Sequence, residues 1–159
     1  MTTKPRLKFA GTSIVCQEVP GEISFTFSVS GCPHRCAGCH SPYLWGDVGE
    51  LLLDNMAFVL EPYKDYVTCV CFMGGDQNLE ELSQALAVIK ELGLKTCVYS
   101  GLDDLKDLER IIHLLDYCKI GRYDERFGGI NLETTNQKMY KLMDGACVDI
   151  TGEFQKKKG

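Results

Sequence analysis

The chain has 159 residues, of which 45% are hydrophobic and 25% are charged, as in an ordinary globular protein. This length favours one domain and excludes a complete eight-fold βα barrel, which typically takes roughly 250 residues. The net charge of −5 excludes the basic footprint of a nucleic-acid-binding protein, and no apolar run approaches the roughly 18 residues that cross a bilayer. We therefore expect no nucleic acid and no membrane among its partners.

The pattern of apolar residues predicts strands and helices that alternate along the chain. The segment EISFTFSVS has the period of two that marks a strand, whereas YVTCVCFM is a continuous apolar run, typical of a strand covered on both faces. The predicted elements are a first strand within 7–19, strands at 22–30, 66–73, 94–100 and 117–121, helices at 51–60 and 79–93, and a third helix marked by Leu105, Leu108, Ile112 and Leu115.

This order of elements predicts an α/β fold in which a parallel sheet carries helices on its outer face. Asp103 or Asp104 is available to cap the third helix. Residues 122–137 are predicted as a long loop, and residues 152–159 as a frayed tail. No repeat or linker divides the chain, which predicts a single domain.

Nine cysteines are more than a cytosolic chain of this length ordinarily carries. Their odd number, and an N-terminus without the apolar segment of a secretion signal, argue against a disulfide scaffold. We therefore expect a cytoplasmic protein with reduced thiols. The cysteines interpreted as core or boundary residues are Cys16, Cys69, Cys71, Cys97, Cys118 and Cys147.

The other three cysteines, Cys32, Cys36 and Cys39, form C-x3-C-x2-C in a loop after the second predicted strand. Thiolates this close in sequence can bind one metal centre, and ligand sites in parallel α/β sheets gather at the carboxyl ends of strands. With His34 or His40 as a fourth ligand, the loop would hold structural zinc. With three cysteines alone, it would hold a [4Fe–4S] cluster with one iron open to a substrate. The spacing leaves both metals open.

The C-x3-C-x2-C loop resembles the signature of the radical S-adenosylmethionine (SAM) superfamily. The longer run GCPHRCAGCHSPYLW resembles the activating proteins of anaerobic (class III) ribonucleoside-triphosphate reductases. So do Gly74-Gly75-Asp76, VYSG at 98–101 and TTNQ at 134–137, in the expected order. The resemblance covers a core of about 21–141. It implies a single radical SAM domain over 1–159, with an incomplete, open (βα) barrel of the TIM type.

Members of this family hold a [4Fe–4S] cluster on the three cysteines, and the open iron binds SAM through its amino and carboxylate groups. One electron from the reduced cluster, supplied by a donor such as flavodoxin or ferredoxin, cleaves SAM to methionine and a 5′-deoxyadenosyl radical. The radical takes a hydrogen atom from a backbone glycine of the reductase. The resemblance thus implies an oxidoreductase that generates a glycyl radical, with no catalytic group beyond the cluster and SAM.

The resemblance also implies which residues bind SAM. Gly74 and Gly75 match a strand end, GGE or GGD, whose backbone approaches the methionyl amine, and Asp76 would orient the site. The further matching stretch, whose backbone lies along the adenine, is Gly38, Cys39 and His40.

Two positions depart from the superfamily pattern. Gly38 stands where many members carry an aromatic residue, a feature shared with the reductase activators. Gln77 replaces the proline that often follows GGD, which predicts a slightly different turn.

Several alternatives stay open on the sequence alone. A small radical SAM enzyme that acts on a metabolite, such as a 7-carboxy-7-deazaguanine synthase, or an activase of another glycyl radical enzyme, would carry the same loop. A non-catalytic Cys3His zinc module would use the loop for protein contacts. The GGD segment by itself is an ordinary strand-to-helix turn capped by an aspartate or by Asn78. Arg122, Tyr123 and Asn136 either line the SAM pocket or belong to a solvated loop.

Overall fold

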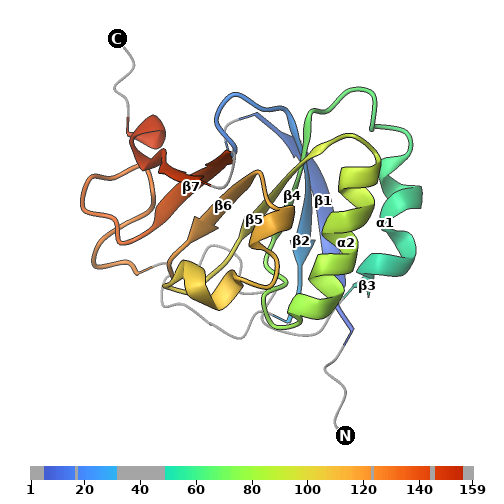
Figure 1. Ribbon diagram of the computed structural model, residues 1–159, viewed down its shortest axis with the longest axis horizontal. Helices are drawn as coiled ribbons and strands as arrows, with labels where there is room; N and C mark the ends of the chain where they lie inside the picture. Colours follow the sequence, from blue (N-terminus) through green and yellow to red (C-terminus); the bar gives the residue numbers. More distant parts are fainter. Residues whose placement is uncertain (1–5, 17, 32–48, 123, 144–145, 156–159) are drawn as a thin grey trace, which may run out of the picture.

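The computed structural model describes residues 6–16, 18–31, 49–122, 124–143 and 146–155. Its centre is an eight-stranded sheet in the order β3-β1-β2-β4-β5-β6-β7-β8 (Figure 1). The strands are β1 (Lys8–Val15), β2 (Ser24–Val29), β3 (Glu50–Leu51), β4 (Cys69–Met73), β5 (Lys95–Tyr99), β6 (Tyr117–Ile120), β7 (Lys138–Met143) and β8 (Ala146–Asp149). The α-helices within these residues are α1 (Leu52–Leu60) and α2 (Leu79–Glu91).

The middle of the sheet is parallel and its edges are antiparallel. Strands β2, β4, β5 and β6 lie side by side in parallel register, which confirms the strands predicted in these segments. Strand β1 pairs antiparallel with β2 and β3, and β7 pairs antiparallel with β6 and β8. The sheet is therefore mixed, and the prediction of a parallel sheet was wrong at both edges. Parallel neighbours need a crossover, usually helical, to return to the same end of a sheet, and the described residues between β1 and β2 and between β6 and β7 contain no helix.

Both α-helices cover one face of the sheet, which we call the outer face (Figure 1). Helix α2 begins at Asn78, whose side chain accepts a hydrogen bond from the backbone N–H of Glu81 at 3.2 Å. Such a cap satisfies one of the N–H groups that the first turn leaves unpaired. Both helices lie where the apolar spacing predicted them.

The predicted third helix was wrong in type. Residues 105–114 form two short 3₁₀ turns, η2 (Leu105–Leu108) and η3 (Ile112–Leu114), and the Asp104 side chain caps η2. Leu108, Ile111 and Leu115 are buried, so inward positions recur at intervals of three and four residues. A 3₁₀-helix has three residues per turn. Over so short a segment, the spacing of its apolar residues cannot be distinguished from that of an α-helix.

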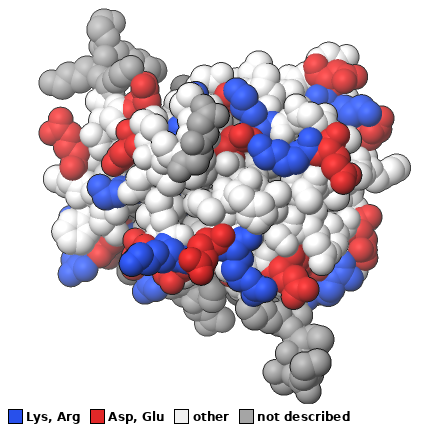
Figure 2. All heavy atoms as spheres, in the orientation of Figure 1, with Lys and Arg blue, Asp and Glu red and all other residues white. Residues whose placement is uncertain are grey.

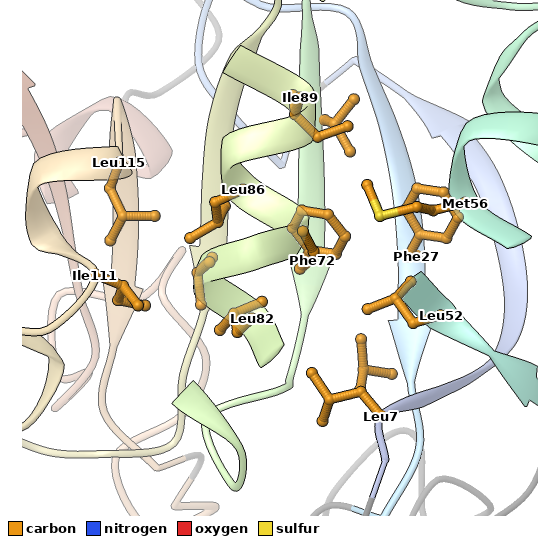
Figure 3. Packing of buried hydrophobic residues seen from close by; sticks show 14 of the residues in the cluster. Leu7, Phe27, Leu52, Met56, Phe72, Leu82, Leu86, Ile89, Ile111 and Leu115 are labelled. Atoms are coloured by element: carbon orange, nitrogen blue, oxygen red, sulfur yellow. The ribbon is translucent and has the colours of Figure 1, made fainter. Parts of the chain in front are cut away.

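The sheet separates two apolar clusters. In the outer cluster, leucines and Ile89 of α2 pack against phenylalanines of the sheet. Among these, the rings of Phe72 and Phe27 stack with centroids 5.5 Å apart (Figure 3). The opposite face, which we call the inner face, carries a smaller cluster of Val19, Cys69, Cys71, Cys97, Tyr117, Ile130 and Met139. Ile150 and Phe154, the latter from the 3₁₀ turn η4 (Thr151–Phe154), pack against this inner cluster.

The surface over the helices mixes both signs of charge. Figure 2 shows lysine and arginine side chains interspersed with aspartates and glutamates on this face, without a large area of one sign. None of the helices in the described residues has the length and apolar character needed to cross a bilayer.

Candidate functional site

Five of the predicted site residues lie outside the described part of the structure: Cys32, Cys36, Cys39, Gly38 and His40. The described residues include Ser30 and Gly31, which directly follow β2 and precede the loop cysteines. The other predicted site residues, Gly74, Gly75 and Asp76, directly follow β4, which pairs in parallel with β2. The cysteine loop and the GGD turn therefore start from neighbouring strand ends on the same edge of the sheet.

The GGD turn needs glycine for its own conformation. Gly74 and Gly75 have φ values of +110° and +103°, which residues with a side chain rarely adopt. A Cβ on Gly74 would also lie 3.2 Å from the carbonyl oxygen of Val29. The ordinary interpretation of the segment as a strand-to-helix turn capped by Asn78 is thus confirmed. The same conformation leaves bare backbone at the strand end, where a ligand can approach closely.

Gln77 ties this turn to the base of the cysteine loop. Its Nε2 donates a hydrogen bond of 2.8 Å to the backbone carbonyl of Ser30, which precedes Gly31 and the first loop cysteine. Its Oε1 is buried and has no hydrogen-bond partner within the described residues. Gln77, which stands where the superfamily pattern often has proline, therefore makes a polar contact between the GGD turn and the base of the cysteine loop.

A chain of hydrogen bonds joins the next strand ends. The Ser100 hydroxyl, after β5, donates to Asp76 Oδ2 at 2.6 Å and accepts from the Leu102 N–H at 3.0 Å. The Leu102 carbonyl in turn accepts from the N–H of Gly121, after β6, at 2.8 Å. The carboxylate of Asp76 is thus held in place by the VYSG segment, and the ends of β4, β5 and β6 are fixed relative to one another.

The TTNQ segment holds the loop that follows β6. Asn136 Nδ2 donates to the Arg122 carbonyl at 3.0 Å, and Gln137 Nε2 donates to the Gly121 carbonyl at 3.1 Å. Thr135 Oγ1 donates to a further loop carbonyl at 3.2 Å. The Arg122 side chain is exposed, and Tyr123 lies outside the described residues. Because its side chains are engaged with backbone carbonyls, this segment orders the loop at the same edge of the sheet.

The thiols of the inner face belong to the core. Cys69, Cys71 and Cys97 are fully buried and free, and burial raises the pKa of Cys69 and Cys97 far above the ordinary value of a thiol. A neutral thiol is a poor metal ligand and nucleophile. No group of three or more histidines, cysteines, aspartates or glutamates in the described part of the chain is arranged to hold a metal ion.

The remaining described cysteines divide between core and surface. Cys118 is buried among the outer cluster, where burial raises the pKa of its thiol to about 12. Cys16 and Cys147 are exposed, so their interpretation as core or boundary residues was wrong. Cys147 lies in β8, an edge strand whose residues are all exposed.

Lys119 is a partly buried cation that the sequence patterns did not single out. It lies in β6, where register places it beside Tyr99 of β5, and Tyr99 is in turn beside Met73 at the end of β4. Its Nζ lies 4.5 Å from the centre of the Tyr99 ring. Burial lowers the pKa of Lys119, and it makes no ion pair with any carboxylate in the described ranges. The inner face thus carries a lysine near the ends of the parallel strands, where the Glu18 carboxylate raises its pKa by less than burial lowers it.

The chain matches the model of a known family, described as a 4Fe-4S single cluster domain, over residues 19–158. It is also 28% identical over 130 residues to the anaerobic ribonucleoside-triphosphate reductase-activating protein of Enterobacteria phage T4. That alignment covers 74% of this chain and 83% of the phage protein, and it confirms the resemblance to the activating proteins. No solved structure gave a significant match. Because the family match spans most of its length, the chain belongs to the 4Fe-4S single cluster domain family.

Proposed function

We propose that this protein is a radical SAM activase that generates a glycyl radical on an anaerobic ribonucleoside-triphosphate reductase. The family match supports the iron–sulfur cluster, and the name of the phage relative indicates the class of protein substrate. The observation that carries the proposal is the hydrogen bond from Gln77 to Ser30, because it fixes the GGD turn at the base of the cysteine loop. This contact supports the proposal that the residues assigned to the cluster and to SAM belong to one site.

The described residues fit the methionyl end of SAM. This group is a zwitterion with an ammonium and a carboxylate. The bare backbone at Gly74 and Gly75 allows close approach, and the ammonium of Lys119 favours an anionic group on the inner face. When bound, the cluster and SAM supply one-electron cleavage of SAM and hydrogen abstraction from a glycine.

In this proposal the residues of the chain bind and position. Cys32, Cys36 and Cys39 hold the cluster, and Gly38, Cys39 and His40 lie along the adenine. Gly74 and Gly75 approach the methionyl amine, and Asp76 is kept in orientation by its hydrogen bond with Ser100. The electron comes from a donor such as flavodoxin or ferredoxin, in a reducing cytoplasm.

We further propose that the parallel strands β2, β4, β5 and β6 form half of an open (βα) barrel. Within the described residues, the α-helices cover the outer face, and residues of the loops and of turn η4 pack on the inner face. These residues hold four parallel strands, half the number of a closed (βα) barrel of eight. A glycine-bearing loop of a large protein substrate can therefore reach the strand ends from the side.

The decisive experiment uses protein reconstituted anaerobically with iron and sulfide, then mixed with reductant, SAM and the candidate reductase. We expect 5′-deoxyadenosine in solution and the EPR doublet of a glycyl radical on the reductase. Cys36→Ala should lose the cluster and both products. Cys147→Ala, which removes an exposed thiol at the sheet edge, should keep all three.

Three results would contradict the proposal. SAM cleavage that leaves no radical on the reductase would indicate an enzyme acting on a metabolite or on another partner. Zinc without iron in anaerobically purified protein would indicate the Cys3His module. Equal losses in the two cysteine variants would mean that the C-x3-C-x2-C loop has no special role.

A further inference from the structure

Gln77 has more structure around it than a turn residue requires. Its side chain spans from the end of β4 to the end of β2, where Nε2 donates to the Ser30 carbonyl at 2.8 Å. A Cβ on Gly31 would lie 3.4 Å from the same nitrogen, so the amide lies directly against the base of the cysteine loop. Asn78, the next residue, caps α2 and fixes the backbone that carries the glutamine.

These contacts determine which way the amide faces. A carbonyl oxygen can accept a hydrogen bond but cannot donate one, so the nitrogen of Gln77 must face Ser30 and Oε1 must point away from it. Oε1 is nevertheless buried, and it has no donor in the described ranges. A buried acceptor without a donor costs stability, so a protein that keeps one offers a place for a ligand N–H or O–H.

We propose that Gln77 Oε1 accepts a hydrogen bond from the α-ammonium of SAM, which makes Gln77 a residue that recognises the amino-acid end of the ligand. The inference rests on the proposed function, and it assigns a binding role to a side chain where the family pattern has proline. A carboxylate would be repelled by this oxygen, whereas an ammonium carries three N–H donors. The same amide thus connects the cysteine loop to the ligand through its two ends.

A cycle of two ligands and two variants tests this assignment by binding affinity alone. S-adenosylhomocysteine keeps the α-ammonium, whereas methylthioadenosine keeps the adenine and ribose but lacks the amino-acid end. In cluster-loaded protein, Gln77→Met should weaken S-adenosylhomocysteine about tenfold or more, since hydrogen bonds to charged groups are among the stronger ones. Methylthioadenosine should change by no more than about twofold.

Gln77→Glu separates the oxygen from the nitrogen. It keeps an acceptor for the ammonium but loses the donor to Ser30, so S-adenosylhomocysteine should bind at least as tightly, relative to methylthioadenosine, as in the wild type. If Gln77→Met fails to keep the cluster, the proposal is decided by Gln77→Glu alone, from the ratio of its affinity for S-adenosylhomocysteine to its affinity for methylthioadenosine. The matched control is Gln84→Met, the same change at an exposed position of α2, which should alter neither affinity.

The outcomes distinguish the two levels of inference. If cluster-loaded wild-type protein binds no S-adenosylhomocysteine, the proposed function fails and this assignment fails with it. If the wild type binds but Gln77→Met leaves its affinity unchanged, or weakens both ligands equally, the ammonium contact is overturned and the function stands. The ammonium contact is also overturned if Gln77→Glu binds S-adenosylhomocysteine, relative to methylthioadenosine, more weakly than the wild type does.

Discussion

The two faces of this sheet are built from the same strands but from different chemistry. On the outer face, β4 places Val70 and Phe72 among the leucines of α2, where the side chains are large, apolar and fully buried (Figure 3). On the inner face, the same strand places Cys69 and Cys71, and β5 and β6 add tyrosines and a partly buried lysine. Successive residues of one strand therefore face very different surroundings.

The difference indicates that the outer face mainly stabilises the fold, whereas the inner face is suited to binding. Apolar burial is worth about 25 cal/mol for each Å² removed from water, so the outer face contributes most to folding. Thiols bury little area, and Lys119 costs free energy where it lies. A face that gives up stability in this way, next to the strand ends that carry the candidate site, is suited to binding.

The largest expected effect is on stability, from a pair of adjacent substitutions in β4. Phe72→Ala removes a ring that stacks on Phe27, and we expect it to lower the free energy of unfolding by about 3–5 kcal/mol. Cys71→Ala removes a single sulfur from the inner face and should cost only about 1 kcal/mol. Anaerobic urea unfolding of both variants measures the contrast, and equal losses would contradict the division between the faces.

An intermediate effect is expected from Lys119→Met. Because this partly buried charge forms no ion pair within the described residues, its removal should leave the free energy of unfolding nearly unchanged. The affinity for S-adenosylhomocysteine should fall about tenfold, because the ligand's carboxylate loses a nearby cation. Calorimetric titration measures the affinity, and Lys106→Met, an exposed lysine in η2, is the control.

The pH dependence of this binding gives a second readout. Because burial lowers the pKa of Lys119, its charge is lost at a lower pH than in an exposed lysine. Wild-type affinity should therefore decline as the pH rises toward that lowered pKa, whereas the affinity of Lys119→Met should not follow this decline. Parallel profiles in the two proteins would remove Lys119 from the binding site.

The smallest effect is expected at the opposite edge of the inner face. Glu22 Oε2 accepts hydrogen bonds from Tyr117 at 2.8 Å and from Lys95 at 2.9 Å. Burial alone would raise the pKa of Glu22, but hydrogen bonds from neighbouring side chains outweigh it, and the pKa lies below its ordinary value. The stability from this group is therefore complete above the unfolded pKa of about 4.3 and is lost as the pH falls through the folded value.

Glu22→Gln tests this sign. We expect a loss of about 1 kcal/mol at pH 7 and a smaller further loss between pH 5 and the acid limit than in the wild type. Urea midpoints measured across this range provide the comparison. An unchanged acid limb would mean that Glu22 is not responsible for it.

The predictions that succeeded rest on local patterns. The alternation in EISFTFSVS and the helical spacing from Leu79 onward predicted β2 and α2 because a buried face requires these periods whatever it packs against. The third helix failed because its apolar spacing fits two kinds of turn. Strands β7 and β8 were missed, although Asp144-Gly145 between them is a strong hairpin signal in the sequence.

The candidate site divides in the same way. GGD was found from its place after a buried apolar run, but Gln77 was noted only as a departure from proline, and its contact with Ser30 joins residues 47 positions apart. A lone lysine in the segment YCKIG was the available signal for Lys119. Nothing local in the sequence indicates that its ammonium lies over the ring of Tyr99 in the adjacent strand β5.

The sequence by itself determined the order of the central elements, the place of the cysteine loop after β2, and the reduced state of the buried thiols. Each of these follows from residues close together in the chain. Only the tertiary structure decided that the sheet edges are antiparallel, that Gln77 reaches Ser30 at the base of the cysteine loop, and that Lys119 lies against the Tyr99 ring. These features depend on which strands become neighbours, and that is set by the packing of the whole chain.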